Sequence, residues 1–189
     1  MTKWQITTEP TIEPITLAEA KLHLRVDGTT DDDLITSLIK AARQWCEEYQ
    51  NRAYITQTIT WKLDNFPCGF TVPRPKLQSV TSIKYIDQQG DEQTLDTSIY
   101  DVDIYSEPAR IVLAYGQVWP LLRGDINSVE VIFKAGYGDT ADKVPDRIKA
   151  AIKLLLGHLY EHREDVSTLR HESVPFGVMS LLSVDRVFV

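Results

Sequence analysis

Three residues near the end of the chain, His158, Glu161 and His162, have the types and spacing of a metal-binding helix. Their order, H-x-x-E-H, places the two histidines at positions i and i+4, on one face of a helix. A zinc peptidase site also needs a third protein ligand from another element and an open coordination position for water. The rest of the sequence must supply that ligand if the chain is a zinc enzyme.

The sequence after His162 offers little that could complete such a site. Only 27 residues follow it, and their carboxylates do not belong to a second long helical pattern. The negative end of a helix dipole favours cationic side chains, which accounts for His162 and Arg163 without a metal. We therefore expect no catalytic residue, metal or cofactor. A small zinc-dependent hydrolase with His158 and His162 as ligands remains the enzymatic alternative.

A glycine-rich segment, residues 136–141, imitates the G-x-G-x-x-A fingerprint of dinucleotide-binding folds. Pro145 predicts that the next helix begins too late for Gly138 to present its N–H group to a phosphate along the helix dipole. The sequence contains neither a G-x-x-x-x-G-K-[ST] loop nor a G-x-S-x-G elbow. These patterns favour a glycine-rich exit from a strand and a protein that is not an enzyme.

Composition limits the classes of partner. The 20 Lys and Arg residues against 27 Asp and Glu residues give a net charge of -7, which argues against an extended basic surface for nucleic acid. Cys46 and Cys68 form no C-x-x-C pair, and a reduced intracellular compartment is expected. No signal peptide or stretch of ~20 apolar residues is present, so a soluble, cytoplasmic protein without a membrane segment is expected. An acidic protein-binding module is a further alternative.

Helical patterns occupy both ends of the chain. Thr16 and Glu19 form a capping box that predicts a short helix to about Arg25. The acidic run 31–33 predicts the start of a second helix, and Pro145 that of a third. Apolar residues at spacings of three and four define the buried faces of the second and third helices: Leu34, Ile35, Leu38, Ile39, Ala42, Trp45, Cys46 and Tyr49, then Ile148, Ala151, Ile152, Leu155, Leu156 and Leu159.

Between these helices the pattern changes to a period of two, which is typical of strands. Strands are predicted at residues 55–63, 80–86, 100–104, 110–114 and 129–135, as an antiparallel meander of five to seven strands. The predicted fold class is α+β: a small helical bundle of three main helices plus a C-terminal short helix or arm, with an inserted antiparallel β unit. Residues 1–52 and 139–189 are assigned to the helical core and residues 53–138 to the β unit.

The end of the chain, residues 174–189, carries more apolar surface than a free terminus needs. It either docks on a neighbouring subunit or packs back on its own helices. The candidate assembly residues are Phe176, Leu181, Leu182, Arg186, Val187 and Phe188.

Five segments, in this order and spacing, resemble the head-tail connector proteins of long-tailed bacteriophages and prophages, also called head completion or adaptor proteins. The resemblance is closest to the subgroup with a β-rich insertion. The segments are PITLAEAKLHLRVD (14–27), DDDLITSLIKAARQWCEEYQNRAYITQT (31–58), PRPKLQSVTSIKYIDQQG (73–90), FKAGYGDTADKVPDRIKAAIKLLLGHLYEHRED (133–165) and VPFGVMSLLSVDRV (174–187).

The resemblance implies a structural protein that forms a ring, expected to be a dodecamer, beneath the portal. The implied partners are further copies of the chain, the portal, and a tail-side stopper or completion protein. DNA would pass through the ring without sequence-specific binding, as the acidic net charge also favours. Assembly would take place in the host cytoplasm, and the finished ring would lie at the head-tail junction of the virion. The helical core would build the ring, and the apolar tail would dock on a neighbour or on the portal.

Overall fold

The computed structural model describes residues 4–162 and 176–188, which divide into two compact units. A β unit contains residues 4–10 and 56–137, and a helical unit contains residues 11–55, 138–162 and 176–188. Within these described stretches, no helix is long and apolar enough to span a membrane.

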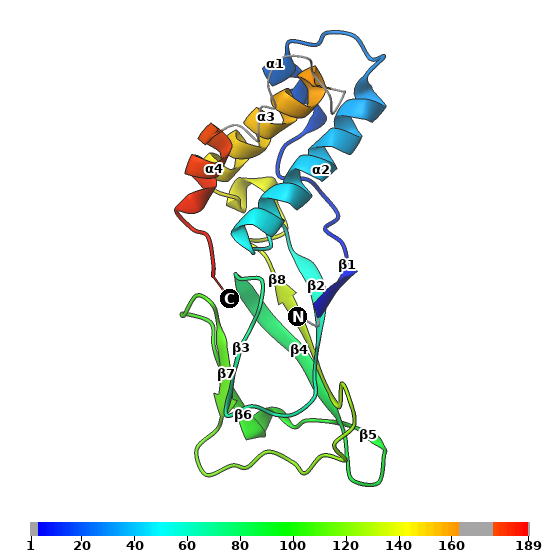
Figure 1. The fold of residues 1–189 in the computed structure, drawn as a ribbon, viewed down its shortest axis with the longest axis vertical. Helices are drawn as coiled ribbons and strands as arrows, with labels where there is room; N and C mark the ends of the chain where they lie inside the picture. The colour runs from blue at the N-terminus through cyan, green and yellow to red at the C-terminus, as the bar shows by residue number, and fades with distance from the viewer. Residues whose placement is uncertain (1–3, 163–175, 189) are drawn as a thin grey trace. The chain divides into compact units, whose positions relative to one another are not determined.

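The helical unit contains α1 (Leu17–Leu24), α2 (Asp32–Gln50), α3 (Asp146–Glu161) and α4 (Phe176–Ser183), with a 3₁₀ turn, η2 (Ala141–Lys143), before α3. Helix α3 packs against each of the other three helices, as Figure 1 shows. The fully buried core consists mainly of aliphatic side chains from α2, α3 and α4: Ile35, Ile39, Ala42, Cys46, Ile148, Ala151, Ile152, Leu156, Val178 and Leu182.

Local sequence explains where the first two helices begin. The backbone N–H of Glu19 donates to Thr16 Oγ1 over 3.2 Å, and the Thr16 N–H donates to the Glu19 carboxylate over 2.8 Å, so the predicted capping box is formed. The acidic run precedes and opens α2, as predicted, but Asp31 caps no backbone N–H with its side chain. Its carboxylate instead accepts a hydrogen bond from the Tyr160 hydroxyl on α3.

The β unit is built on a five-stranded antiparallel sheet in the order β1-β2-β8-β4-β5. Its central strand, β8, pairs with β2 on one side and with β4 on the other (Figure 1). Alternate residues of β8 are fully buried, as expected for a strand with one face in the core: Val129, Val131, Phe133 and Ala135. The strands are β1 (Trp4–Thr8), β2 (Gln57–Leu63), β4 (Leu77–Ile86), β5 (Glu92–Thr94) and β8 (Val129–Ala135).

A second antiparallel sheet has three strands in the order β3-β7-β6. Its strands are β3 (Gly69–Thr71), β6 (Tyr100–Asp103) and β7 (Arg110–Leu113), and a 3₁₀ turn, η1 (Thr97–Ile99), comes directly before β6. Aromatic side chains connect the two sheets. The Phe70 ring on β3 lies 6.0 Å from the Trp61 ring on β2, and Phe66 stacks on Trp119 at 4.8 Å. The indole N–H of Trp119 donates to the Pro67 oxygen over 3.0 Å, which fixes the long connection before β8.

The structure confirms the predicted α+β class, and it corrects two details. The strands do not form a meander, because β8 pairs with β2 and β4 rather than with its sequence neighbour. Residues 4–8, which the sequence assigned to the helical core, form the edge strand β1 of the five-stranded sheet. Near the other boundary, Gly136 and Gly138 follow β8 and α3 starts only at Asp146, which agrees with the glycine-rich strand exit predicted there.

Candidate assembly surfaces

The two histidines of the H-x-x-E-H pattern lie side by side at the end of α3. Their ring centroids are 4.6 Å apart, and His162 Nδ1 lies 3.1 Å from the backbone oxygen of His158. Among residues 4–162 and 176–188, no three His, Cys, Asp or Glu side chains are grouped in a way that could hold a metal ion. The carboxylate of Asp185, one of the few acidic groups after His162, forms an ion pair with Arg147. Glu164, Asp165, His171 and Glu172 lie outside the described residues.

The C-terminal arm, residues 176–188, is fastened to the end of α2 through main-chain atoms. The Gln50 side-chain amide donates to the backbone oxygen of Leu182 over 2.7 Å. The Val187 N–H donates to the backbone oxygen of Gln50 over 3.0 Å. Arg52 Nε donates to the backbone oxygen of Asp185 over 2.5 Å. Because these bonds involve backbone atoms of the arm, they fix its path and leave its outward side chains available for other contacts.

A buried polar network on α2 supports this attachment. Arg43 lies within 2.7 Å of carboxylate oxygens of both Glu13 and Glu47. Glu47 also accepts a 2.7 Å hydrogen bond from the Tyr54 N–H, and the Tyr54 hydroxyl donates to the Gln50 side-chain oxygen over 2.7 Å. Burial by itself would lower the pKa of Arg43, but the carboxylates of Glu47 and Glu13 outweigh it and raise the pKa. Arg43 is therefore a permanent cation in the helical core.

The predicted assembly residues of the arm separate into an exposed and a buried set. Phe176 and Phe188 are 85% and 82% exposed, and the Arg186 guanidinium lies 4.5 Å from the Tyr49 ring and 5.1 Å from the Phe188 ring. Leu181 and Val187 are half-buried. Leu182 is fully buried and packs inside its own helical unit. The exposed members, together with Val184, form the arm outer face: Phe176, Val184, Arg186 and Phe188.

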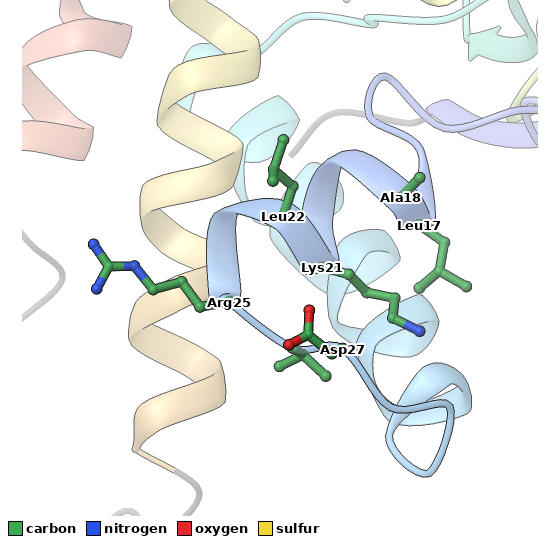
Figure 2. Close-up of a pocket in the computed structure, with 7 residues that line it drawn as sticks. Leu17, Ala18, Lys21, Leu22, Arg25 and Asp27 are labelled. Atoms are coloured by element: carbon green, nitrogen blue, oxygen red, sulfur yellow. The ribbon is translucent and has the colours of Figure 1, made fainter.

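Helix α1 and the residues after it border an open depression, the α1 depression, with a volume of about 770 Å³. Figure 2 shows its side chains spread along α1 and around the turn that follows the helix. Leu22 is 82% exposed there, and Lys21 is held by Asp32 at 2.6 Å. The lining combines apolar and charged residues: Leu17, Ala18, Lys21, Leu22, Arg25, Val26 and Asp27.

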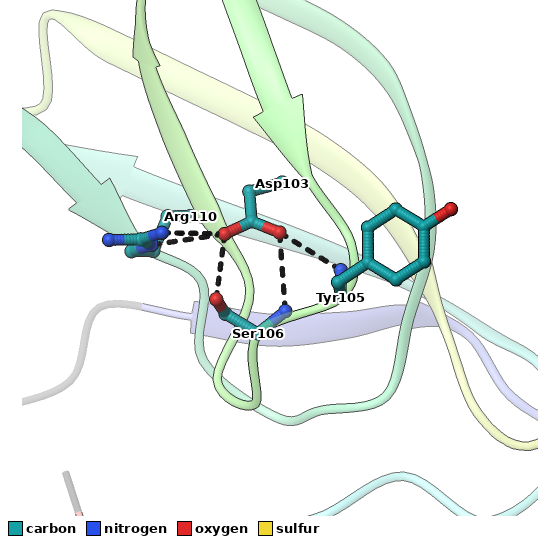
Figure 3. A network of polar contacts seen from close by, with 4 residues as sticks. All are labelled: Asp103, Tyr105, Ser106 and Arg110. Atoms are coloured by element: carbon teal, nitrogen blue, oxygen red, sulfur yellow. Dashed lines mark hydrogen bonds and ion pairs between the residues drawn. The ribbon is translucent and has the colours of Figure 1, made fainter.

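A second feature, the β6–β7 turn, presents an aromatic side chain. Asp103 accepts hydrogen bonds from the Tyr105 N–H at 3.0 Å and from the Ser106 hydroxyl at 2.7 Å, and it pairs with Arg110 at 2.7 Å (Figure 3). Hydrogen bonds from Ser106, Arg110 and the Tyr105 backbone hold the pKa of Asp103 far below its usual range. Tyr105 itself is 97% exposed and points away from this network.

Sequence reasoning missed Leu22 and Tyr105 as surface features. Leu22 falls within a short helix whose apolar positions define no clear face, and Tyr105 lies in a turn without periodicity. A large apolar residue between Asp103 and Glu107 is the one signal that could have drawn attention to this turn, because such turns are usually polar.

A family model and several solved structures are similar to this chain. Residues 14–105 match the model of the phage gp6-like head-tail connector protein. The fold is similar to a chain in the neck of an empty gene transfer agent particle computed with C6 symmetry, with a TM-score of 0.83 and 23% identity. It is also similar to chains in the virion of the native particle (TM-score 0.79, 25% identity) and in its neck computed with C12 symmetry (0.74, 24%). Each likeness covers 98% of this chain and 96% of the other.

No curated protein matches the chain. The family match includes the capping box of α1, all of α2 and the strands from β2 to β6, but not β1. The structural likeness extends over α3 and α4 as well. Both agree with the resemblance seen in the five sequence segments. Residues 14–105 thus match the phage head-tail connector family, and the chain as a whole has the fold of a chain from a particle neck.

Proposed function

We propose that this protein is a structural connector that forms a ring at the head-tail junction of a phage-like particle. The ring joins the portal to a tail-side stopper or completion protein and lets DNA pass. The observation that carries the proposal is the fold likeness to a particle-neck chain, which covers 98% of this chain at a TM-score of 0.83. Because related necks were computed with C6 and C12 symmetry, a dodecamer on the portal is the proposed assembly.

The charge of the chain supports a passage for DNA rather than a binding site. A net charge of -7 repels the phosphate backbone, so DNA can move through a ring of such subunits without being held. The proposed role is structural and not enzymatic. Assembly in the host cytoplasm, followed by residence at the head-tail junction of the particle, is part of the same proposal.

The arm outer face is the proposed contact with a neighbouring subunit or with the portal. Phe176 and Phe188 expose large aromatic surfaces, while the backbone of the arm is fixed to α2. Aromatic side chains on a fixed backbone lose little conformational entropy on binding, and they are favoured as anchors of protein interfaces. Deleting the arm would be a poor test, since Val178 and Leu182 belong to the helical core.

The test therefore uses substitutions on the surface of the intact chain. Purified protein is mixed with its portal and examined by electron microscopy and light scattering. We expect rings on the portal for the natural sequence and loss of these rings for the variant Phe176→Asp with Phe188→Asp. Lys40→Asp, an exposed change on α2, is the control and should still assemble. Failure of the natural chain to bind portal would refute the connector role. Normal rings from the double variant would refute only the role of the arm outer face.

A further inference from the structure

We propose that the β6–β7 turn of one copy inserts Tyr105 into the α1 depression of the next copy in the ring. This inference rests on the proposed function, because it names a contact between subunits of that ring. A ring with more than two subunits needs two different surfaces on each copy, repeated head to tail. The described residues offer an exposed aromatic side chain on a turn, Tyr105, and an open depression lined partly by apolar residues, the α1 depression.

The β6–β7 turn is rigid before any partner binds. Asp103 gathers the Tyr105 and Ser106 N–H groups, the Ser106 hydroxyl and the Arg110 guanidinium around one carboxylate, at distances of 2.7 to 3.2 Å (Figure 3). Tyr105 is 97% exposed, and the neighbouring Ile104 is partly exposed. A turn fixed in this way loses little conformational entropy when its aromatic side chain enters a pocket.

The α1 depression has the properties that an aromatic side chain requires. Leu17, Leu22 and Val26 supply apolar surface, and the depression of about 770 Å³ is large enough to take a tyrosine ring. Leu22 is 82% exposed although it lies on a helix of the helical unit. Its burial by a partner would therefore remove apolar area from water. Tyrosine is among the residues that most often anchor such contacts.

Charge favours the same pairing. Glu107 is exposed in the β6–β7 turn, two residues after Tyr105. Arg25 lines the α1 depression, is exposed, and forms no ion pair with any residue that the structure describes. A turn that brings Glu107 to the rim of the depression would place opposite charges together at the edge of an apolar contact, which selects for the correct register.

Tyr115 provides an internal comparison. It is as exposed as Tyr105 and also belongs to the β unit. Its turn, however, is closed by one backbone hydrogen bond, from the Gln117 N–H to the Ala114 oxygen, without a carboxylate such as Asp103 to fix it. Tyr115 is therefore the matched control for an exposed tyrosine without a rigid support.

Disulfide capture between copies tests the contact directly. The background variant is Cys68→Ser, since Cys68 is exposed, whereas burial raises the pKa of the Cys46 thiol to about 12 and keeps it protonated. Chains with Tyr105→Cys are mixed with chains carrying Leu22→Cys, assembled on the portal and oxidised. We expect dimers, and a ladder of larger species when both substitutions are on the same chain. Replacing Tyr105→Cys by Tyr115→Cys should abolish the cross-linked products.

Charge reversal supplies a second readout that does not depend on cysteine chemistry. Glu107→Arg should reduce ring formation at least tenfold, Arg25→Glu should do the same, and the two changes together should restore it. Thermal unfolding of each single variant checks that the chain still folds. Rings that form without any Tyr105–Leu22 cross-link, and that tolerate both single reversals, would overturn this contact and leave the connector role intact. If no rings form from the natural chain, both proposals fail.

Discussion

The side-chain amide of Gln50 donates a 2.7 Å hydrogen bond to the backbone oxygen of Leu182, which joins the end of α2 to α4. The same side chain accepts from the Tyr54 hydroxyl, and the Gln50 backbone oxygen accepts from the Val187 N–H. One glutamine thus holds the C-terminal arm at two points and links it to the buried polar network of α2.

Removing this side chain should loosen the arm. Gln50→Ala leaves the Leu182 oxygen and the Tyr54 hydroxyl in the core without these partners, and we expect a loss of about 1–3 kcal/mol in the free energy of unfolding. Denaturant titration measures the loss, and hydrogen exchange at residues 182–187 should become faster. Gln44→Ala, on the exposed side of the same helix, is the control and should change stability by less than about 0.5 kcal/mol. Equal effects of the two substitutions would contradict the role of Gln50.

Arg43 should be indispensable because of the carboxylate it neutralises. Arg43→Met keeps much of the side-chain volume but leaves Glu47 buried beside an apolar group, which should cost about 3–5 kcal/mol of stability. Adding Glu47→Gln removes the uncompensated charge while retaining an oxygen that can accept from the Tyr54 N–H. The double variant should therefore be more stable than Arg43→Met in denaturant titration. A double variant that is less stable would show that the charge of Glu47 is not the problem.

The β6–β7 turn should weaken in acid. The pKa of Asp103 is lower in the folded chain than in the unfolded chain, so the stability it contributes is complete above the unfolded pKa of about 3.9 and is lost as the pH falls further. Asp103→Asn should destabilise the protein at about pH 6, and this difference from the natural chain should shrink at about pH 2.5. Urea midpoints at the two pH values measure it, with Asp101→Asn as the control. A difference independent of pH would contradict the prediction.

The histidine pair should bind no structural metal. His158 and His162 find no third ligand among residues 4–162 and 176–188, and neighbouring imidazoles alone hold zinc weakly. Metal analysis of the purified protein should give well under one zinc per chain. The variant His158→Ala with His162→Ala should retain its unfolding temperature and ring assembly. Stoichiometric zinc that this variant loses would instead favour the hydrolase alternative.

Much of the helical unit could be predicted because local signals determine it. The Thr16–Glu19 box, the acidic run before α2 and Pro145 mark the starts of helices, and the structure places α1, α2 and α3 at these points. Most of the predicted apolar stripes are buried, and the structure leaves these members half-buried: Leu34, Leu38, Trp45, Tyr49 and Leu159. Apolar periodicity could not reveal the buried polar network. Arg43, Glu47 and Gln50 lie on the buried face of α2, whereas polar and charged residues in a helix usually indicate the face exposed to solvent.

The β unit was less predictable, because strand pairing depends on residues far apart in the sequence. The period of two located β2, β4 and β8, yet only the fold shows that β8 lies between the other two. Strands β3 and β5 have three residues each and are too short for a pattern to emerge. The exposed side chains proposed for assembly were the least predictable, since an apolar residue in a pattern indicates burial, and the sequence does not distinguish Leu182 from Phe188.

Strand β1 means that residues 56–137 do not carry the complete five-stranded sheet. The strand pairs with β2 at the edge of the five-stranded sheet, but it is encoded before α1, separately from residues 56–137. Moving residues 56–137 alone into another chain would transfer a sheet that lacks its edge strand and leaves Ile59 and Trp61 at an open edge. The five-stranded sheet is thus encoded in two separate stretches of the chain, and transfer of the complete sheet requires both.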